Sequence, residues 1–188
     1  MHTVKFLRHH GFDYRHESYG RHGMVSWMGA VDALQVPWGA PVDRRHPTLH
    51  VVRCPLHVVG SICAAVLYEH DRTPFLKFVR KYVSLPTTNE LAIAAHFWTT
   101  WNKLARSTHP EHVCRVDVPG ELDQLLDHVR AHQRPQAGVS GLMPGTRTNH
   151  RQDYTVPTMA DIGPTLPGWA LDDFIETARF YGYKLETE

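Results

Sequence analysis

The strongest constraint on the fold is a stretch of the chain, residues 86–106, in which apolar side chains recur around more than half of a helix circumference. Pro86-Thr-Thr-Asn-Glu has the composition of a helix start. A surface helix carries one apolar stripe, whereas a helix that is apolar on most sides is buried. The pattern therefore predicts a central, buried helix. Its apolar positions are Leu91, Ala94, Ala95, Phe97, Trp98, Trp101, Leu104 and Ala105.

Shorter patterns surround this helix. Apolar residues at helical spacing predict further helices over 24–35, 55–70, 74–83, 119–132 and 168–181, and runs of strand-forming residues predict strands over 3–8, 48–53 and 112–118. In the last helix we expect Trp169, Leu171, Phe174, Ile175 and Ala178 to be buried. The expected fold class is α+β and predominantly helical, with five or six helices and two or three short strands.

Residues 134–168 have a different composition, because ten of them are Gly or Pro and the apolar ones show no period. A loop of this length is usually functional or a linker. We therefore expect one domain overall. Residues 1–133 would form a mixed α/β body, 134–167 an irregular segment that wraps it, and 168–188 a C-terminal helix that docks on it.

The longest uninterrupted apolar run is Ile62–Tyr68, which is far shorter than the roughly 20 residues of a membrane span. The first ten residues lack the apolar core of a signal peptide. We expect a cytoplasmic protein with no membrane partner. Cys54, Cys63 and Cys114 are too few and odd in number for a disulfide framework, so reduced thiols are expected.

Histidine is unusually common, with 15 residues. Near the ordinary histidine pKa of about 6.5, the net charge of the chain should depend steeply on pH. Charge is also uneven along the chain, because residues 153–188 hold seven acidic and two basic side chains whereas the part before them is mildly basic. That excess is too small to identify a nucleic-acid binder by itself.

Several familiar catalytic motifs are missing from the sequence. It contains no phosphate-binding glycine loop, no HExxH metalloprotease motif, no GxSxG elbow and no kinase motif. The leading interpretation is therefore an interaction or regulatory protein that binds a protein or a nucleic acid. The alternative is a histidine-using phosphoesterase or nuclease, with or without zinc, so the sequence leaves enzyme activity open.

Four residues could form a split zinc site. Cys54 and His57 lie three apart at a predicted strand-to-helix junction, and His112 and Cys114 lie on one face of a predicted strand. Two cysteines and two histidines are a common ligand set for tetrahedral zinc. The alternative is that the cysteines are small buried apolar residues and the histidines lie at the surface.

Two short patterns suggest histidine catalysis. His16-Glu-Ser18 and His46-Pro-Thr48 resemble the paired His-x-Ser/Thr motifs of two-histidine phosphoesterases, in which histidine acts as general acid or base. The number of such matches equals what chance gives in a chain this rich in histidine. Arg106-Ser-Thr-His109-Pro-Glu-His112 resembles the arginine and histidine arrangement of helical ribonuclease domains of the HEPN type. That resemblance implies that Arg106 stabilises phosphorane charge while His109 or His112 moves the proton.

A basic face on neighbouring helices is the candidate nucleic-acid site. A patch of this kind is enough for phosphate contacts, whereas stacking on bases needs exposed aromatic rings, and the tryptophans are predicted to be buried. The alternative is an ordinary solvated helix face. The residues of the patch are Arg72, Lys77, Arg80, Lys81 and Lys103.

Overall fold

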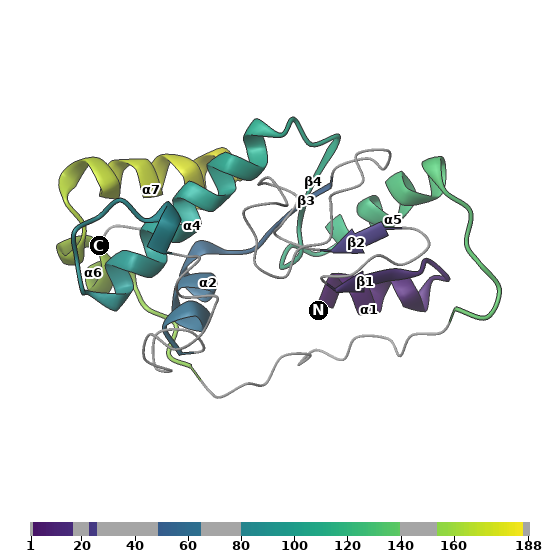
Figure 1. The fold of residues 1–188 in the computed structure, drawn as a ribbon, viewed down its shortest axis with the longest axis horizontal. Coiled ribbons are helices and arrows are strands. Elements are labelled where there is room, and N and C mark those ends of the chain that lie inside the picture. The colour runs from purple at the N-terminus through teal and green to yellow at the C-terminus, as the bar shows by residue number, and fades with distance from the viewer. Residues whose placement is uncertain (1, 17–22, 26–48, 65–79, 140–153, 186–188) are drawn as a thin grey trace. The chain divides into compact units, whose positions relative to one another are not determined.

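The computed structural model describes residues 2–16, 23–25, 49–64, 80–139 and 154–185, and it confirms a predominantly helical α+β fold (Figure 1). The chain divides into two compact units, and each unit is built from two separate stretches of sequence. The first unit contains residues 1–51 and 107–150, and the second contains residues 52–106 and 151–188. The predicted organisation as one domain stays a prediction.

The first unit combines two helices with short strands. Helix α1 (His2–His9) packs against strand β1 (Tyr14–His16) and against helix α5 (Glu121–His132), which also packs on strand β4 (His112–Arg115). Strand β1 pairs in parallel with β2 (Gly23–Val25), and β4 pairs with β3 (Leu49–Val52). A small apolar core joins these elements. It contains Phe6, Leu7, Phe12, Tyr14, Leu126 and Val129.

The prediction of a strand over 3–8 is wrong, because this stretch lies in α1. Val4 and Leu7 are three residues apart and both are buried, which is the spacing of a helix face. The helix ends at His9, and Gly11 in the turn that follows has a φ of 87°, in the left-handed region that favours glycine. There Gly11 N–H donates to Arg8 O, and Phe12 N–H donates to Leu7 O, which also accepts from His10 N–H, so these carbonyls of the last turn are paired.

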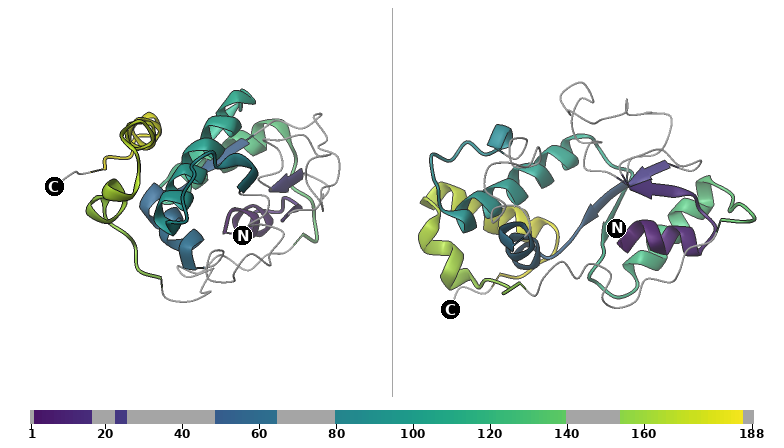
Figure 2. Two further views of the ribbon diagram at one scale, coloured as in Figure 1. Left: turned by 60° about the vertical axis from the view of Figure 1, so that its left-hand side comes forward. Right: turned by 60° about the horizontal axis from the view of Figure 1, so that its bottom comes forward.

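The second unit is built around helix α4 (Glu90–Ser107), which confirms the predicted central helix. Trp98 is only 3% exposed, and its ring meets Phe174 and Tyr181 at centroid distances of 5.5 and 6.4 Å. Phe174 lies on helix α7 (Gly168–Phe180), which runs beside α4 in Figures 1 and 2. The apolar core of this unit therefore depends on contact between two helices that are far apart in sequence.

Three further elements complete the second unit. They are helix α2 (Pro55–Ile62), the one-turn helix α6 (Met159–Ile162) and the 3-10 turn η4 (Gly163–Thr165). Thr158 and Asp161 cap α6 reciprocally, which gives a firm structure to a stretch predicted to be irregular. The chain before α6 passes so close to Gly60 of α2 that a β-carbon there would lie 2.7 Å from Thr155 O.

The remaining predicted elements have mixed outcomes. Strands at 48–53 and 112–118 and helices at 119–132 and 168–181 are confirmed within a few residues by β3, β4, α5 and α7. Met24 and Val25, the first two residues of the predicted helix over 24–35, lie in strand β2 instead. The rest of that helix and most of the one over 74–83 lie outside the described residues. The predicted helix over 55–70 is described to residue 64 and includes α2.

One core assignment is wrong. Trp169 was expected to be buried, but its side chain is 57% exposed. Trp169 and Phe174 are five residues apart, which places them about 140° apart around a helix. Since Phe174 is fully buried, Trp169 faces outward.

Within the described part of the chain, no helix has both the length and the apolar character that crossing a membrane requires.

Candidate metal centre

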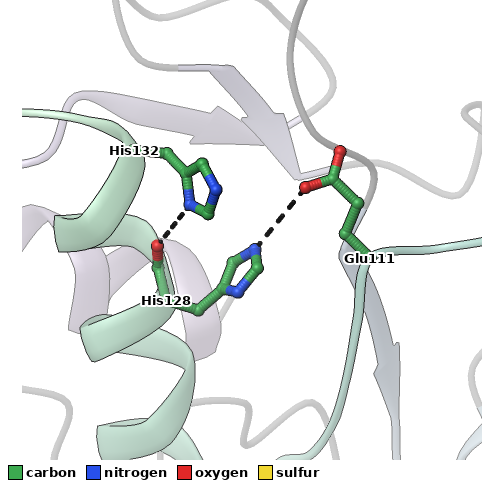
Figure 3. A group of neighbouring side chains, drawn as sticks. All are labelled: Glu111, His128 and His132. Atoms are coloured by element: carbon green, nitrogen blue, oxygen red, sulfur yellow. Dashed lines mark hydrogen bonds and ion pairs between the residues drawn. The ribbon is translucent and has the colours of Figure 1, made fainter.

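Three side chains of the first unit form a group suited to a metal ion. Glu111, His128 and His132 each offer one ligand atom, and these atoms all lie within 4.8 Å of one another. Figure 3 shows the two imidazole rings on α5 and the Glu111 carboxylate, which comes from the chain just before β4. Two nitrogen ligands and one oxygen ligand form a donor set that zinc accepts.

Helix α5 provides the two histidines. His128 and His132 are four residues apart, so they lie one above the other on the same face. The apolar stripe Leu125, Leu126 and Val129 is buried, and this anchors the helix and determines where the histidines lie. Both histidines belong to the last part of the helix, where the partial negative charge of the helix dipole favours a cation.

His132 is prepared to act as a ligand by a hydrogen bond to the backbone. Its Nδ1 lies 2.9 Å from the carbonyl oxygen of His128. Because a carbonyl can only accept, Nδ1 must donate, so the neutral ring keeps its lone pair on Nε2. A ligating histidine typically has its other ring nitrogen held in this way.

His128 is kept neutral by its surroundings. Burial lowers the pKa of its imidazole, the neighbouring His132 and His112 lower it further, and only Glu111 acts in the opposite direction. The neutral form is the one that binds metal. His112 lies almost parallel to it, with ring centroids 5.2 Å apart and an interplanar angle of 19°.

The Nε2 atom of His128 is buried and has no hydrogen-bond partner among the described residues. It lies 3.9 Å from Glu111 Oε2, which is too long for a hydrogen bond. Buried polar atoms are nearly always paired, so an exception of this kind indicates a missing partner such as an ion or a water molecule. A cation placed between His128 and Glu111 would satisfy both atoms.

The present distances require a modest closure around an ion. A tetrahedral ion with bonds of about 2.1 Å holds its ligand atoms about 3.4 Å apart. The Glu111 side chain is 52% exposed and His132 is exposed, so both have room to move inward. His128 is the most buried of the three and would need to move least.

An ion pair holds the two supporting elements together. Arg115 of β4 and Glu121 of α5 form a salt bridge, and Arg115 also donates its backbone N–H and its Nε to the same carboxylate at 2.6 Å each. Burial raises the pKa of Glu121, but the hydrogen bonds and charge of Arg115, with a contribution from His112, outweigh this and lower the pKa overall. The start of α5 is thereby tied to the strand that follows Glu111.

The four residues of the predicted split zinc site lie in both units. Cys54 and His57, at the start of α2, are half-buried in the second unit, whereas His112 and Cys114 lie on β4 in the first. Cys114 is fully buried, and burial raises the pKa of its thiol to about 12, which opposes the thiolate form that zinc needs. The site with two cysteines and two histidines stays a prediction.

The residues predicted to be catalytic are only partly described. His46 lies outside the described residues. Arg106 belongs to the second unit, where its guanidinium carbon lies 4.4 Å from the ring centroid of Phe180, while His109 and His112 belong to the first unit. Helix α4 ends at Ser107, so Arg106, His109 and His112 do not share one helix.

The predicted nucleic-acid residues are also only partly described. Arg72 and Lys77 lie outside the described residues, and Arg80 and Lys81 are exposed. Lys103 forms a 2.6 Å ion pair with Asp173 of α7, so its charge is engaged within the second unit. The patch stays a prediction.

Sequence reasoning selected His112 but missed Glu111, His128 and His132. The signal for the two missed histidines was present, since they are spaced four apart within a helix that was predicted. Glu111 had no local signal, because it approaches these histidines only through the packing of β4 on α5.

Comparisons with protein-family models, curated proteins and solved structures gave no match, so the site is interpreted from its own geometry.

Proposed function

We propose that this protein binds a divalent transition-metal ion, with zinc as the first candidate, through Glu111, His128 and His132. The observation that carries the proposal is the convergence of the three ligand atoms within 4.8 Å. The backbone hydrogen bond of His132 and the unpartnered, buried Nε2 of His128 support it. Magnesium is a poor candidate, because it prefers a shell of oxygen ligands.

The test is a zinc titration of the untagged, chelator-treated protein at pH 7.5, followed by calorimetry and by metal analysis after gel filtration. We expect one zinc ion per chain, and binding weakened at least about tenfold in His132→Gln and in Glu111→Gln. Both changes are at exposed positions, so folding should be retained, which circular dichroism checks. Magnesium in place of zinc should give no signal.

A matched control separates this site from the predicted cysteine site. Cys54→Ser and His57→Gln remove two candidate ligands of the split site and leave the first unit unchanged. Full zinc binding in these variants, with loss in His132→Gln, supports the proposal. Zinc that is lost with Cys54→Ser and retained in His132→Gln would overturn it, as would the absence of zinc binding by the unaltered chain.

The number of ligands that the described residues offer favours a metal that can act on a substrate. Three protein ligands would leave one position of a tetrahedral ion for water, which is the arrangement typical of catalytic zinc, whereas structural zinc has four protein ligands. This supports the zinc-dependent form of the phosphoesterase or nuclease hypothesis. The test is zinc-dependent cleavage of bis(p-nitrophenyl) phosphate, with His132→Gln as the control. Equal rates for the two proteins would contradict hydrolysis at this site while leaving metal binding to be judged by the titration.

A further inference from the structure

The two most exposed large apolar side chains of the described residues both lie on α7. Trp169 and Phe180 are each 57% exposed, ahead of Val113 and Val156 at 39% and 37%. Tryptophan and phenylalanine are enriched at protein interfaces relative to the rest of the surface. They belong to the second unit, whereas the residues of the candidate metal centre belong to the first.

These two rings lie on one face of the helix. They are eleven residues apart, which is about 20° beyond three full turns, and the corresponding rise is about 16 Å. The opposite side of α7 carries Phe174 and Ala178, which are fully buried. The helix therefore has an inner face that packs on α4 and an outer face between Trp169 and Phe180.

Carboxylates occupy the space between the rings. Asp172, Asp173 and Glu176 fall within about 60° of Trp169 around the helix. Asp173 is paired with Lys103, whereas Asp172 and Glu176 are exposed and form no ion pair within the described part of the chain. We call the five residues Trp169, Asp172, Asp173, Glu176 and Phe180 the outer face of α7.

Two contacts show that this outer face accepts cations. The guanidinium carbon of Arg106 lies 4.4 Å from the ring centroid of Phe180, and Lys103 Nζ lies 2.6 Å from Asp173 Oδ1. Both cations come from α4 and reach only one edge of the surface. One cation is bound by an aromatic ring and the other by a carboxylate. Trp169 and Asp172 offer the same two kinds of group, with no cation from the described residues in place.

Trp169 is also held in position before any partner arrives. Its ring meets the buried His96 edge-on, at a centroid distance of 5.7 Å and an interplanar angle of 87°. A side chain ordered in advance loses little entropy on binding. The surrounding sequence adds to the attraction, since residues 153–188 hold seven acidic and two basic side chains.

We propose that the outer face of α7 binds a basic peptide segment of a partner protein. One arginine or lysine side chain would lie on Trp169, another on the part of Phe180 that stays exposed beside Arg106, and the chain between them over Asp172 and Glu176. An extended peptide rises about 3.3 Å per residue, so cations five residues apart span the distance between the rings. This gives the predicted protein partner a surface and a chemistry.

The test uses a fluorescein-labelled hexapeptide, Arg-Gly-Lys-Gly-Gly-Arg, and fluorescence anisotropy with the full chain. One comparison peptide has glutamate at the three charged positions, and another has the same composition with its cations adjacent. We expect only Arg-Gly-Lys-Gly-Gly-Arg to bind. Its affinity should fall at least about fivefold between 0.05 and 0.5 M NaCl, because salt screens exposed charges.

Variants on the outer face should abolish the signal without unfolding the chain. We expect at least tenfold weaker binding in Trp169→Ser and in the charge reversal Glu176→Lys, because both residues are exposed. Arg179→Gln, which changes an exposed residue of the same helix beside this face, should bind at least as well as the unaltered chain. Thermal unfolding of each variant checks that the fold is retained.

Three results would overturn the proposal. The first is no difference in affinity between the basic and acidic peptides. The second is that a fluorescein-labelled oligothymidine binds more tightly than the basic peptide and that Trp169→Ser abolishes this binding, which would make this a nucleic-acid surface. The third is concentration-dependent dimerisation in sedimentation, lost in Trp169→Ser and unaffected by peptide, which would show that a second copy of the chain covers the face.

Discussion

Gly60 is the position at which a single methyl group should test the packing of the second unit. A β-carbon at Gly60 would lie 2.7 Å from Thr155 O, 2.9 Å from Tyr154 Cδ2 and 3.1 Å from Pro157 Cδ. Ordinary contacts of this kind are 3.4–4 Å. The carbonyl oxygen and the proline ring cannot rotate away, so Gly60→Ala must displace the chain that crosses α2.

The expected cost follows from two opposing contributions. Overpacking of a tight contact costs about 1–3 kcal/mol, and a clash with backbone belongs in the upper part of that range. Alanine in a helix is favoured over glycine by about 1 kcal/mol, which offsets part of the loss. We expect Gly60→Ala to lower the free energy of unfolding by about 1–2 kcal/mol.

Gly168→Ala is the matched control. Gly168 is the first residue of α7, and none of the described atoms outside its chain neighbours and its own helix backbone lies within 4 Å of a β-carbon there, so alanine fits without strain. This variant should be more stable than the unaltered chain by about 0.4–1 kcal/mol. Urea unfolding followed by tryptophan fluorescence, with EDTA present, measures both variants. If Gly60→Ala proves as stable as Gly168→Ala, residues 154–157 do not pack on α2 in solution.

Three further predictions test other parts of the structure. Trp98→Ala should lower the free energy of unfolding by about 3–5 kcal/mol, whereas Trp169→Ala at an exposed site should lower it by under about 1 kcal/mol. Similar losses for the two variants in urea titrations would contradict the central position of α4. Gly11→Ala places an L side chain at a φ of 87° and should lower the free energy of unfolding by about 1–2 kcal/mol in the same assay. An unchanged midpoint of urea unfolding would contradict this. Burial lowers the pKa of His96, so this imidazole is protonated at a higher pH in the unfolded chain than in the folded chain. The free energy of unfolding should therefore be unaffected by His96 above about pH 6.5 and should fall as the pH drops through the pKa of the folded state. The loss in urea midpoint between pH 7.5 and 5.5 should be smaller in His96→Gln, and an equal loss would argue against His96 as a contributor.

The long helices could be predicted from the sequence because their signals are local. Apolar residues recur at helical spacing in α4, α5 and α7, and a glycine or a capping residue marks several of their ends. The sequence predicts a strand where α1 lies, because Thr3 and Val4 favour strands in isolation. The packing of Phe6 and Leu7 against α5 outweighs that weak preference.

The candidate sites were harder to predict, because they depend on which elements meet. The pair His128 and His132 could have been found from its spacing, but its relation to Glu111 requires the contact of β4 with α5. Trp169 was assigned to the core from its residue type, although its angle around the helix relative to Phe174 already placed it outside. Composition shows that histidine is abundant in this chain but not which of the 15 residues gather.

The construction of each unit from two separate stretches of sequence has a consequence for how the chain folds during synthesis. Residues 52–106 of the second unit leave the ribosome before any of residues 107–150. Trp98 and its neighbours, however, are fully buried only when α7 has been synthesised and packs on them. Until then the apolar face of α4 is exposed, and pairing over so long a separation is slow compared with local helix formation. The first unit can be complete once residue 150 has emerged, so the unit with the metal ligands should fold first and the larger apolar core last.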